Sequence, residues 1–159
     1  MMKKALALWL ALLWTLLTVG SVLADEEVQA VAVDVAGITF NVPAAWDVDS
    51  EYDEEEGGFI VFARNEDETQ FMVLMVYEVG DEPLETFIEE IKATEGLGGL
   101  KEAKVGDLDF VLYDYADQSN LGAFAITADG FLLLFEFGVA TDPQVAAIAE
   151  QVFLSIAPI

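Results

Sequence analysis

The chain has 159 residues, with 30 Asp and Glu against 6 Lys and Arg, and it contains neither His nor Cys. Without Cys there can be no disulfide, thiolate nucleophile or zinc–thiolate site, and without His there is no imidazole base or imidazole metal ligand. The formal charge of -24 argues against nucleic acid and anionic membrane surfaces as partners, because too few cations are present to replace their counterions.

Residues 1–24 have the pattern of a secretory signal peptide. Lys3 and Lys4 give a positive start, residues 5–19 are apolar, and residues 22–24 precede an acidic stretch. We expect cleavage near Ala24 and a secreted or extracytoplasmic protein. The alternative is an uncleaved N-terminal membrane anchor, because about 20 apolar residues can just span a bilayer. Cleavage would change the formal charge from -24 to -26, since Lys3 and Lys4 leave with the segment.

Residues 25–159 are predicted to form a single domain, which begins with strands. Residues 28–35 show strand-like alternation, and residues 38–42 form a second short strand that Pro43 ends. A hairpin is predicted from residues 59–63 and 71–79, and the second of these runs is apolar on both faces, as in a strand covered on each side.

A helix follows, with Asp81 as its expected cap, Pro83 in its first turn and an apolar face built by Leu84, Phe87, Ile88 and Ile91. It ends before a glycine-rich stretch, residues 96–99, which is predicted to be a flexible loop because a phosphate-binding loop should precede a helix.

Two hairpins and a second helix complete the chain. The hairpins pair residues 101–105 with 108–116 and residues 121–128 with 131–139, the latter across an Asp-Gly turn. The helix opens with Thr141-Asp142-Pro143-Gln144, which has the form of a capping box. The predicted fold class is therefore α+β, an antiparallel sheet of about six to seven strands sandwiched by helices.

The segment from Gly37 to Trp46 supports this fold class. Its sequence, GITFNVPAAW, resembles the G-I-x-F-x-x-P-x-x-W opening of the PsbP-like (Mog-type) superfamily, and the later order of helix, hairpins and helix is similar too. The resemblance covers nearly all of residues 25–159 and implies a PsbP-like layered α/β/α domain, with no catalysis and with docking on partners as the mode of action. Its motifs are structural, so it assigns no binding residue here.

The most concentrated candidate site is acidic. Residues 47–56 contain seven acids, and alternating carboxylates can supply the oxygen ligands of Ca²⁺. The candidate metal ligands are Asp47, Asp49, Glu51, Asp53 and Glu55. The match to an EF-hand loop is superficial, because Tyr52 stands where that loop needs Gly and Gly58 where it needs Glu. A solvated acidic loop is the favoured interpretation.

A hydrolase with two carboxylates is the enzyme hypothesis, and Asp114 and Glu136 are its most notable isolated acids. Both residues fit solvent-facing or edge positions better, and no catalytic residue is assigned. Tyr113 and Tyr115 share a strand face and are expected to pack beneath a helix, while Tyr52 is the aromatic residue expected to be exposed.

The sequence thus predicts an exported, non-catalytic domain that docks on a protein or envelope partner. We expect a monomer without cofactors; the alternative is an extracytoplasmic Ca²⁺-binding protein that uses residues 47–56. Repulsion among 30 acids also predicts that the fold gains stability as the pH falls from about 7 toward 5.

Overall fold

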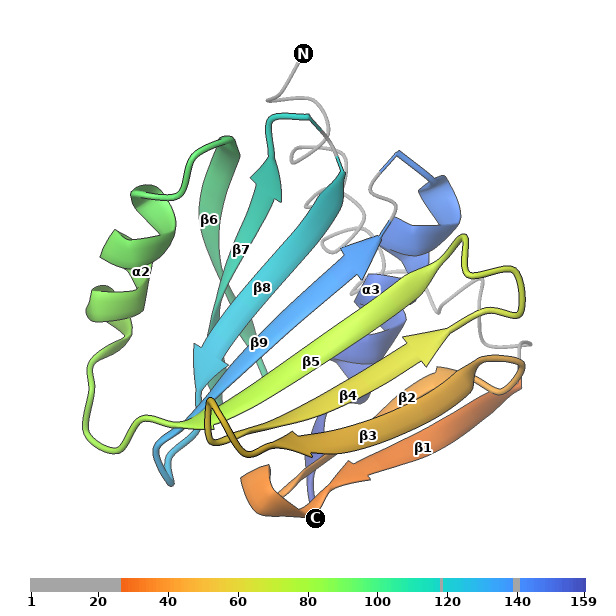
Figure 1. Ribbon diagram of the computed structural model, residues 1–159, viewed down its shortest axis with the longest axis horizontal. Helices are drawn as coiled ribbons and strands as arrows, with labels where there is room; N and C mark the ends of the chain where they lie inside the picture. The colour runs from red at the N-terminus through yellow and green to blue at the C-terminus, as the bar shows by residue number, and fades with distance from the viewer. Residues whose placement is uncertain (1–26, 118, 139–140) are drawn as a thin grey trace.

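A seven-stranded antiparallel sheet forms the centre of the domain, as the computed structural model shows for the described residues, 27–117, 119–138 and 141–159 (Figure 1). The predicted signal peptide and its cleavage site lie outside these residues. In spatial order the strands are β3 (Asp47–Asp53), β4 (Gly58–Arg64), β5 (Phe71–Glu78), β9 (Phe131–Gly138), β8 (Asn120–Ile126), β7 (Leu108–Tyr115) and β6 (Leu97–Val105).

A second, three-stranded antiparallel sheet lies against one face of the large sheet. Its order is β1 (Val28–Val33), β2 (Ile38–Pro43) and β10 (Ala157–Pro158), and a 3-10 turn, η1 (Asp34–Ala36), joins the first two strands. Hydrophobic patterning predicted β1 and β2 but neither β10 nor their separation into a sheet of their own. The turn ends at Gly37, whose φ of 65° belongs to the left-handed region that favours glycine.

The main core lies between the large sheet and the layer formed by the small sheet and helix α3 (Pro143–Ser155), which passes behind β5 and β9 in Figure 1. Aromatic rings dominate its centre. Phe153 of α3 contacts Phe110, Phe135 and Phe137, with ring centroids 5.3–5.6 Å apart. Such edge-to-face and tilted ring contacts stabilise a core beyond the apolar area they bury.

Helix α2 (Leu84–Lys92) packs on the opposite face of the large sheet. Its apolar residues join a second, smaller core cluster with side chains of β7, β8 and β9. The predicted face of Leu84, Phe87, Ile88 and Ile91 is confirmed, since all four contact this cluster. The predicted cap, Asp81, is wrong. Pro83 is the N-cap, and no side chain caps this helix.

The capping of α3 also differs in detail from the prediction. Asp142 is the N-cap, and its Oδ1 accepts a hydrogen bond of 2.9 Å from the backbone N–H of Gln144. The capping box placed Thr141 in this position; because Pro143 fits the first helical turn, the cap falls on the residue directly before it.

Two segments predicted as loops are strands. The acidic residues 47–53 form β3, which pairs in register with β4 over its whole length. Leu97–Gly99 of the glycine-rich stretch begin β6, with an irregular register beside β7. In both cases pairing with a strongly strand-forming neighbour overrides a composition that disfavours strands.

The predicted fold class is confirmed: the domain is α+β, and its seven-stranded antiparallel sheet has a helix on each face. Within the described part of the chain, no helix has the length and apolar character needed to cross a membrane.

Candidate functional site

The face of the large sheet that carries α2 is only partly covered. Helix α2 has nine residues, and the core cluster that it joins contains side chains of β6, β7, β8 and β9 and, from β5, Tyr77. Neither of the two described helices lies in front of β4 and β5 (Figure 1). Five large apolar side chains point from these two strands to the α2 side but belong to neither core cluster. We call this group the open face: Ile60, Phe62, Phe71, Val73 and Met75.

The open face is accessible to a partner. Phe62 has 36% of its surface exposed, and the other four side chains are half-buried by their neighbours on the sheet. A contiguous apolar patch on a sheet that elsewhere has helical cover is a common mark of an interaction surface.

Aromatic rings lie across glycines at three positions on this side of the sheet. Tyr113 faces Gly122, Tyr77 faces Gly58 and Phe71 faces Gly138, each pair directly opposite on neighbouring strands. A Cβ atom added to any of these glycines would lie 2.0–2.3 Å from the facing ring, so the rings occupy the space of the missing side chains. Each ring therefore covers the backbone of the glycine opposite it.

Glu136 of β9 is held by two tyrosines where α2's cover ends. Its Oε1 accepts hydrogen bonds from the hydroxyl groups of Tyr113, at 3.1 Å, and Tyr115, at 3.0 Å. Tyr113 lies on β7, two strands from Glu136 on β9. Its side chain reaches Glu136 because the residue between them in the same cross-strand row, on β8, is Gly122, which has no side chain. Burial, followed by the nearby Glu136 carboxylate, raises the pKa of both tyrosines, so they stay protonated donors at neutral pH.

This row of side chains continues across the open face to the acidic edge. Glu136 is opposite Val73, Val73 is opposite Phe62, and Phe62 is opposite Asp49. With strands about 4.8 Å apart, the carboxylates of Glu136 and Asp49 are attached at positions separated by about 14 Å of apolar surface.

The predicted metal ligands lie along this edge. Asp47, Asp49, Glu51 and Asp53 alternate along β3 and point to the same side as the open face, while Glu55 is in the following turn. Neighbouring positions on one face of a strand are about 6.7 Å apart, whereas Ca²⁺ needs its oxygens at 2.3–2.6 Å. In the described ranges no three acidic side chains group closely enough to hold a metal ion. Binding of Ca²⁺ stays a prediction.

Asp114 and Glu136, the two acids of the hydrolase hypothesis, point to opposite faces of the sheet. Asp114 is only 2% exposed on the α3 side, which corrects its expected solvent-facing position. Burial raises the pKa of its carboxyl, and a backbone hydrogen bond with Gly99 partly offsets this effect. Since the sheet separates the two carboxylates, they cannot act on one substrate as an acid–base pair.

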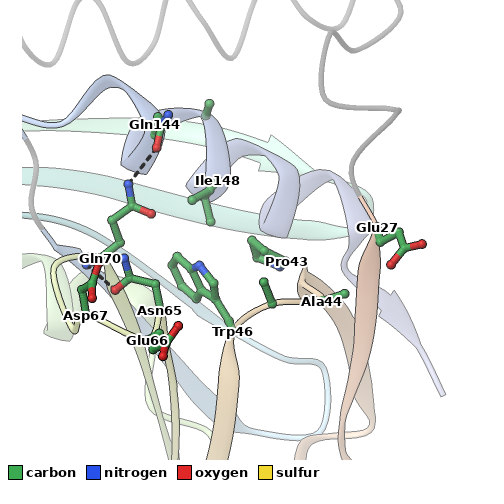
Figure 2. A pocket seen from close by; sticks show the side chains of 12 residues that line it. Glu27, Pro43, Ala44, Trp46, Asn65, Glu66, Asp67, Gln70, Gln144 and Ile148 are labelled. Atoms are coloured by element: carbon green, nitrogen blue, oxygen red, sulfur yellow. Dashed lines mark hydrogen bonds between the residues drawn. The ribbon is translucent and has the colours of Figure 1, made fainter.

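A groove of about 570 Å³ beside Trp46 is a second candidate site (Figure 2). The Trp46 ring is buried between the β2–β3 turn and α3, and Gln29 donates hydrogen bonds to the carbonyls of Pro43 and Trp46. On the far wall, Gln70 donates to Asp142 Oδ2 at 2.8 Å and to Gln144 Oε1 at 3.0 Å. The amide groups of these walls donate to neighbouring side chains or to the backbone, which indicates a structural role.

The predictions for Tyr52, Tyr113 and Tyr115 are confirmed. Tyr113 and Tyr115 pack in the α2 cluster, and Tyr52 is 63% exposed. Sequence reasoning missed Gly122, Gly138 and the apolar residues of the open face. Alternation along residues 59–63 and 71–79 placed these apolar side chains on one face, but only the position of α2 shows which of them stay uncovered.

Comparisons with known proteins agree on the fold. No family model matches the chain, and no curated protein matches it. Among solved structures, the cyanobacterial PsbP protein (CyanoP) from Synechocystis superposes with a TM-score of 0.63 at 16% identity, covering 89% of this chain and 99% of that one. A protein from Bacteroides thetaiotaomicron gives a TM-score of 0.51 at 16% identity, covering 82% of this chain and 48% of that one. The domain has a PsbP-like fold.

Proposed function

We propose that this protein is an exported, non-catalytic domain that docks on a protein or envelope partner through the open face. The observation that carries the proposal is the group of five apolar side chains on β4 and β5 that lie outside both core clusters of the described residues. Leaving such a group in water costs free energy, at about 25 cal/mol per Å² of apolar surface, and a docked partner would recover that cost.

Two further observations support docking over catalysis. The acids considered for hydrolysis, Asp114 and Glu136, lie on opposite faces of the sheet. Glu136 is itself fixed by two tyrosine hydroxyls, which suits a recognition group with one defined orientation.

Site-specific photo-crosslinking in cells of the source organism tests the proposal. The crosslinking amino acid replaces Phe62 or Val73 on the open face and, as a control, Val35, which is 47% exposed in the turn after β1. We expect residues 62 and 73 to capture the same partner and residue 35 not to capture it. Identical products from all three positions would refute docking through the open face.

A further inference from the structure

We propose that the occupant of the open face is a cationic amphipathic helix of a partner protein. Its apolar stripe covers β4 and β5, one flank places an Arg or Lys on Glu136, and the other flank faces the acids of β3. This proposal rests on the docking function above and adds the chemistry of the partner.

The dimensions of the uncovered area fit one helix. Sheet faces in layered domains are covered by helices that bury an apolar stripe, as α2 and α3 do here. The uncovered strip from β3 to β9 spans three strand spacings, or about 14 Å, and a helix with its side chains is about 10–12 Å wide. Along the strands, the open-face residues 71–75 of β5 extend about 17 Å, the length of about 11 helical residues.

The charged side chains that border this strip are mostly acidic. One border carries Asp47, Asp49, Glu51 and Asp53, and the other carries Glu136. Arg64, the basic side chain among the described residues of β3, β4, β5 and β9, lies on the same side opposite Asp47, and it pairs with Glu68 at 3.3 Å. A partner with acidic flanks would meet like charges on both sides, whereas Arg and Lys flanks complement both borders.

The Glu136 carboxylate is held in an orientation that suits a basic side chain on the flank of the partner helix. The two tyrosine hydroxyls fix Oε1, so the carboxylate cannot swing away, and none of the described contacts occupies Oε2. The half-buried ring of Tyr115, packed against the buried ring of Tyr113 with centroids 5.8 Å apart, lies beside it and offers aromatic surface to a guanidinium group. Charge and ring contacts together favour Arg over Lys at this position.

Binding of a designed peptide to the purified full chain tests the proposal. The probe is an amphipathic helix of about 18 residues with Leu on one face and Arg on both flanks. A second peptide carries neutral citrulline in place of each Arg. We expect Kd to rise at least about tenfold for the citrulline peptide and at least about tenfold for Glu136→Gln with the Arg peptide, because a tenfold change corresponds to losing one good charged contact.

Asp34→Asn is the matched control, since it removes one negative charge from the exposed turn after β1, away from the open face. We expect this variant to change Kd by less than about twofold. Equal effects of Glu136→Gln and Asp34→Asn would mean that the probe responds only to overall charge, and this would overturn the proposal.

A second readout separates this proposal from the docking function. Phe62→Ser should weaken the Arg and citrulline peptides alike, because it removes apolar contact but no charge. If crosslinking confirms docking while the citrulline and Arg peptides bind equally, docking stands and the cationic helix fails. If sedimentation shows that the full chain dimerises and Phe62→Ser makes it monomeric, the occupant is a second copy, which also overturns the proposal.

Discussion

Glu150 makes the stability of the domain depend on pH. This residue of α3 is 2% exposed, and neither carboxyl oxygen has a hydrogen-bond partner among the described residues. Burial raises its pKa from 4.5 to about 7. The folded state therefore holds the proton more tightly than the unfolded state, so this contribution is full below pH 4.5 and declines as the pH rises toward 7.

The size of the effect follows from the two pKa values. They differ by about 2.5, and each pKa unit corresponds to ~1.4 kcal/mol, which gives an upper limit of about 3 kcal/mol. An ionised glutamate relieves part of this cost by rotating its flexible side chain toward water, so we expect about 1–2 kcal/mol. Glu150→Gln removes the cost, because Gln has a similar shape and no charge.

Urea unfolding of the full chain, followed by far-UV circular dichroism at pH 5, 6, 7 and 8, measures this contribution. We expect Glu150→Gln to exceed the parent by less than about 1 kcal/mol at pH 5 and by about 1–2 kcal/mol at pH 8. Glu90→Gln is the control, since Glu90 is exposed on α2 and its removal relieves only general repulsion. Identical pH profiles for the two variants would refute the burial argument.

Three further outcomes are expected from the structure. Gly122→Ala should destabilise the fold by about 1–3 kcal/mol because the added Cβ would meet the Tyr113 ring. The same change should cost less in a Tyr113→Leu background, and a double-mutant cycle measured by urea unfolding can show this difference. Asp142→Ala should cost about 0.5–2 kcal/mol in thermal or urea unfolding through loss of the α3 cap. Calcium titration at physiological salt should show no saturable site, because same-face carboxylates on β3 are spaced about 6.7 Å apart.

Each outcome has a result that contradicts it. Equal costs of Gly122→Ala in both backgrounds would mean that ring and glycine are not coupled. If Thr141→Ala destabilised α3 as much as Asp142→Ala, the result would support the predicted capping box, with Thr141 as the N-cap. A one-to-one calorimetric isotherm with Ca²⁺ that Asp49→Asn abolishes would re-establish the calcium-binding hypothesis.

Local sequence signals were sufficient for most of the elements. The turn residues Gly106-Asp107 and Asp129-Gly130 located two hairpins, and apolar spacing located both helices, because these features depend on residues a few positions apart. The strand β3 escaped detection since Asp and Glu disfavour strands in isolation, and its pairing with β4 supplies the stabilisation.

The candidate site needed information that no local pattern contains. Glu136 meets Tyr113 and Tyr115 only because the register of β7, β8 and β9 places Gly122 between Tyr113 and Glu136. The open face likewise depends on where a nine-residue helix stops, and apolar alternation looks the same on covered and uncovered strands.

The pairing of rings with glycines has an evolutionary consequence. Gly122, Gly58 and Gly138 each leave space that one particular aromatic side chain fills, so a larger residue at the glycine is tolerated only if the ring becomes smaller. The two positions of each pair should therefore change together in descendants of a common ancestor. Sequences that retain Tyr113 should retain Gly122. Sequences that lose the tyrosine should accept a larger residue at position 122 and should also lose the acid at position 136.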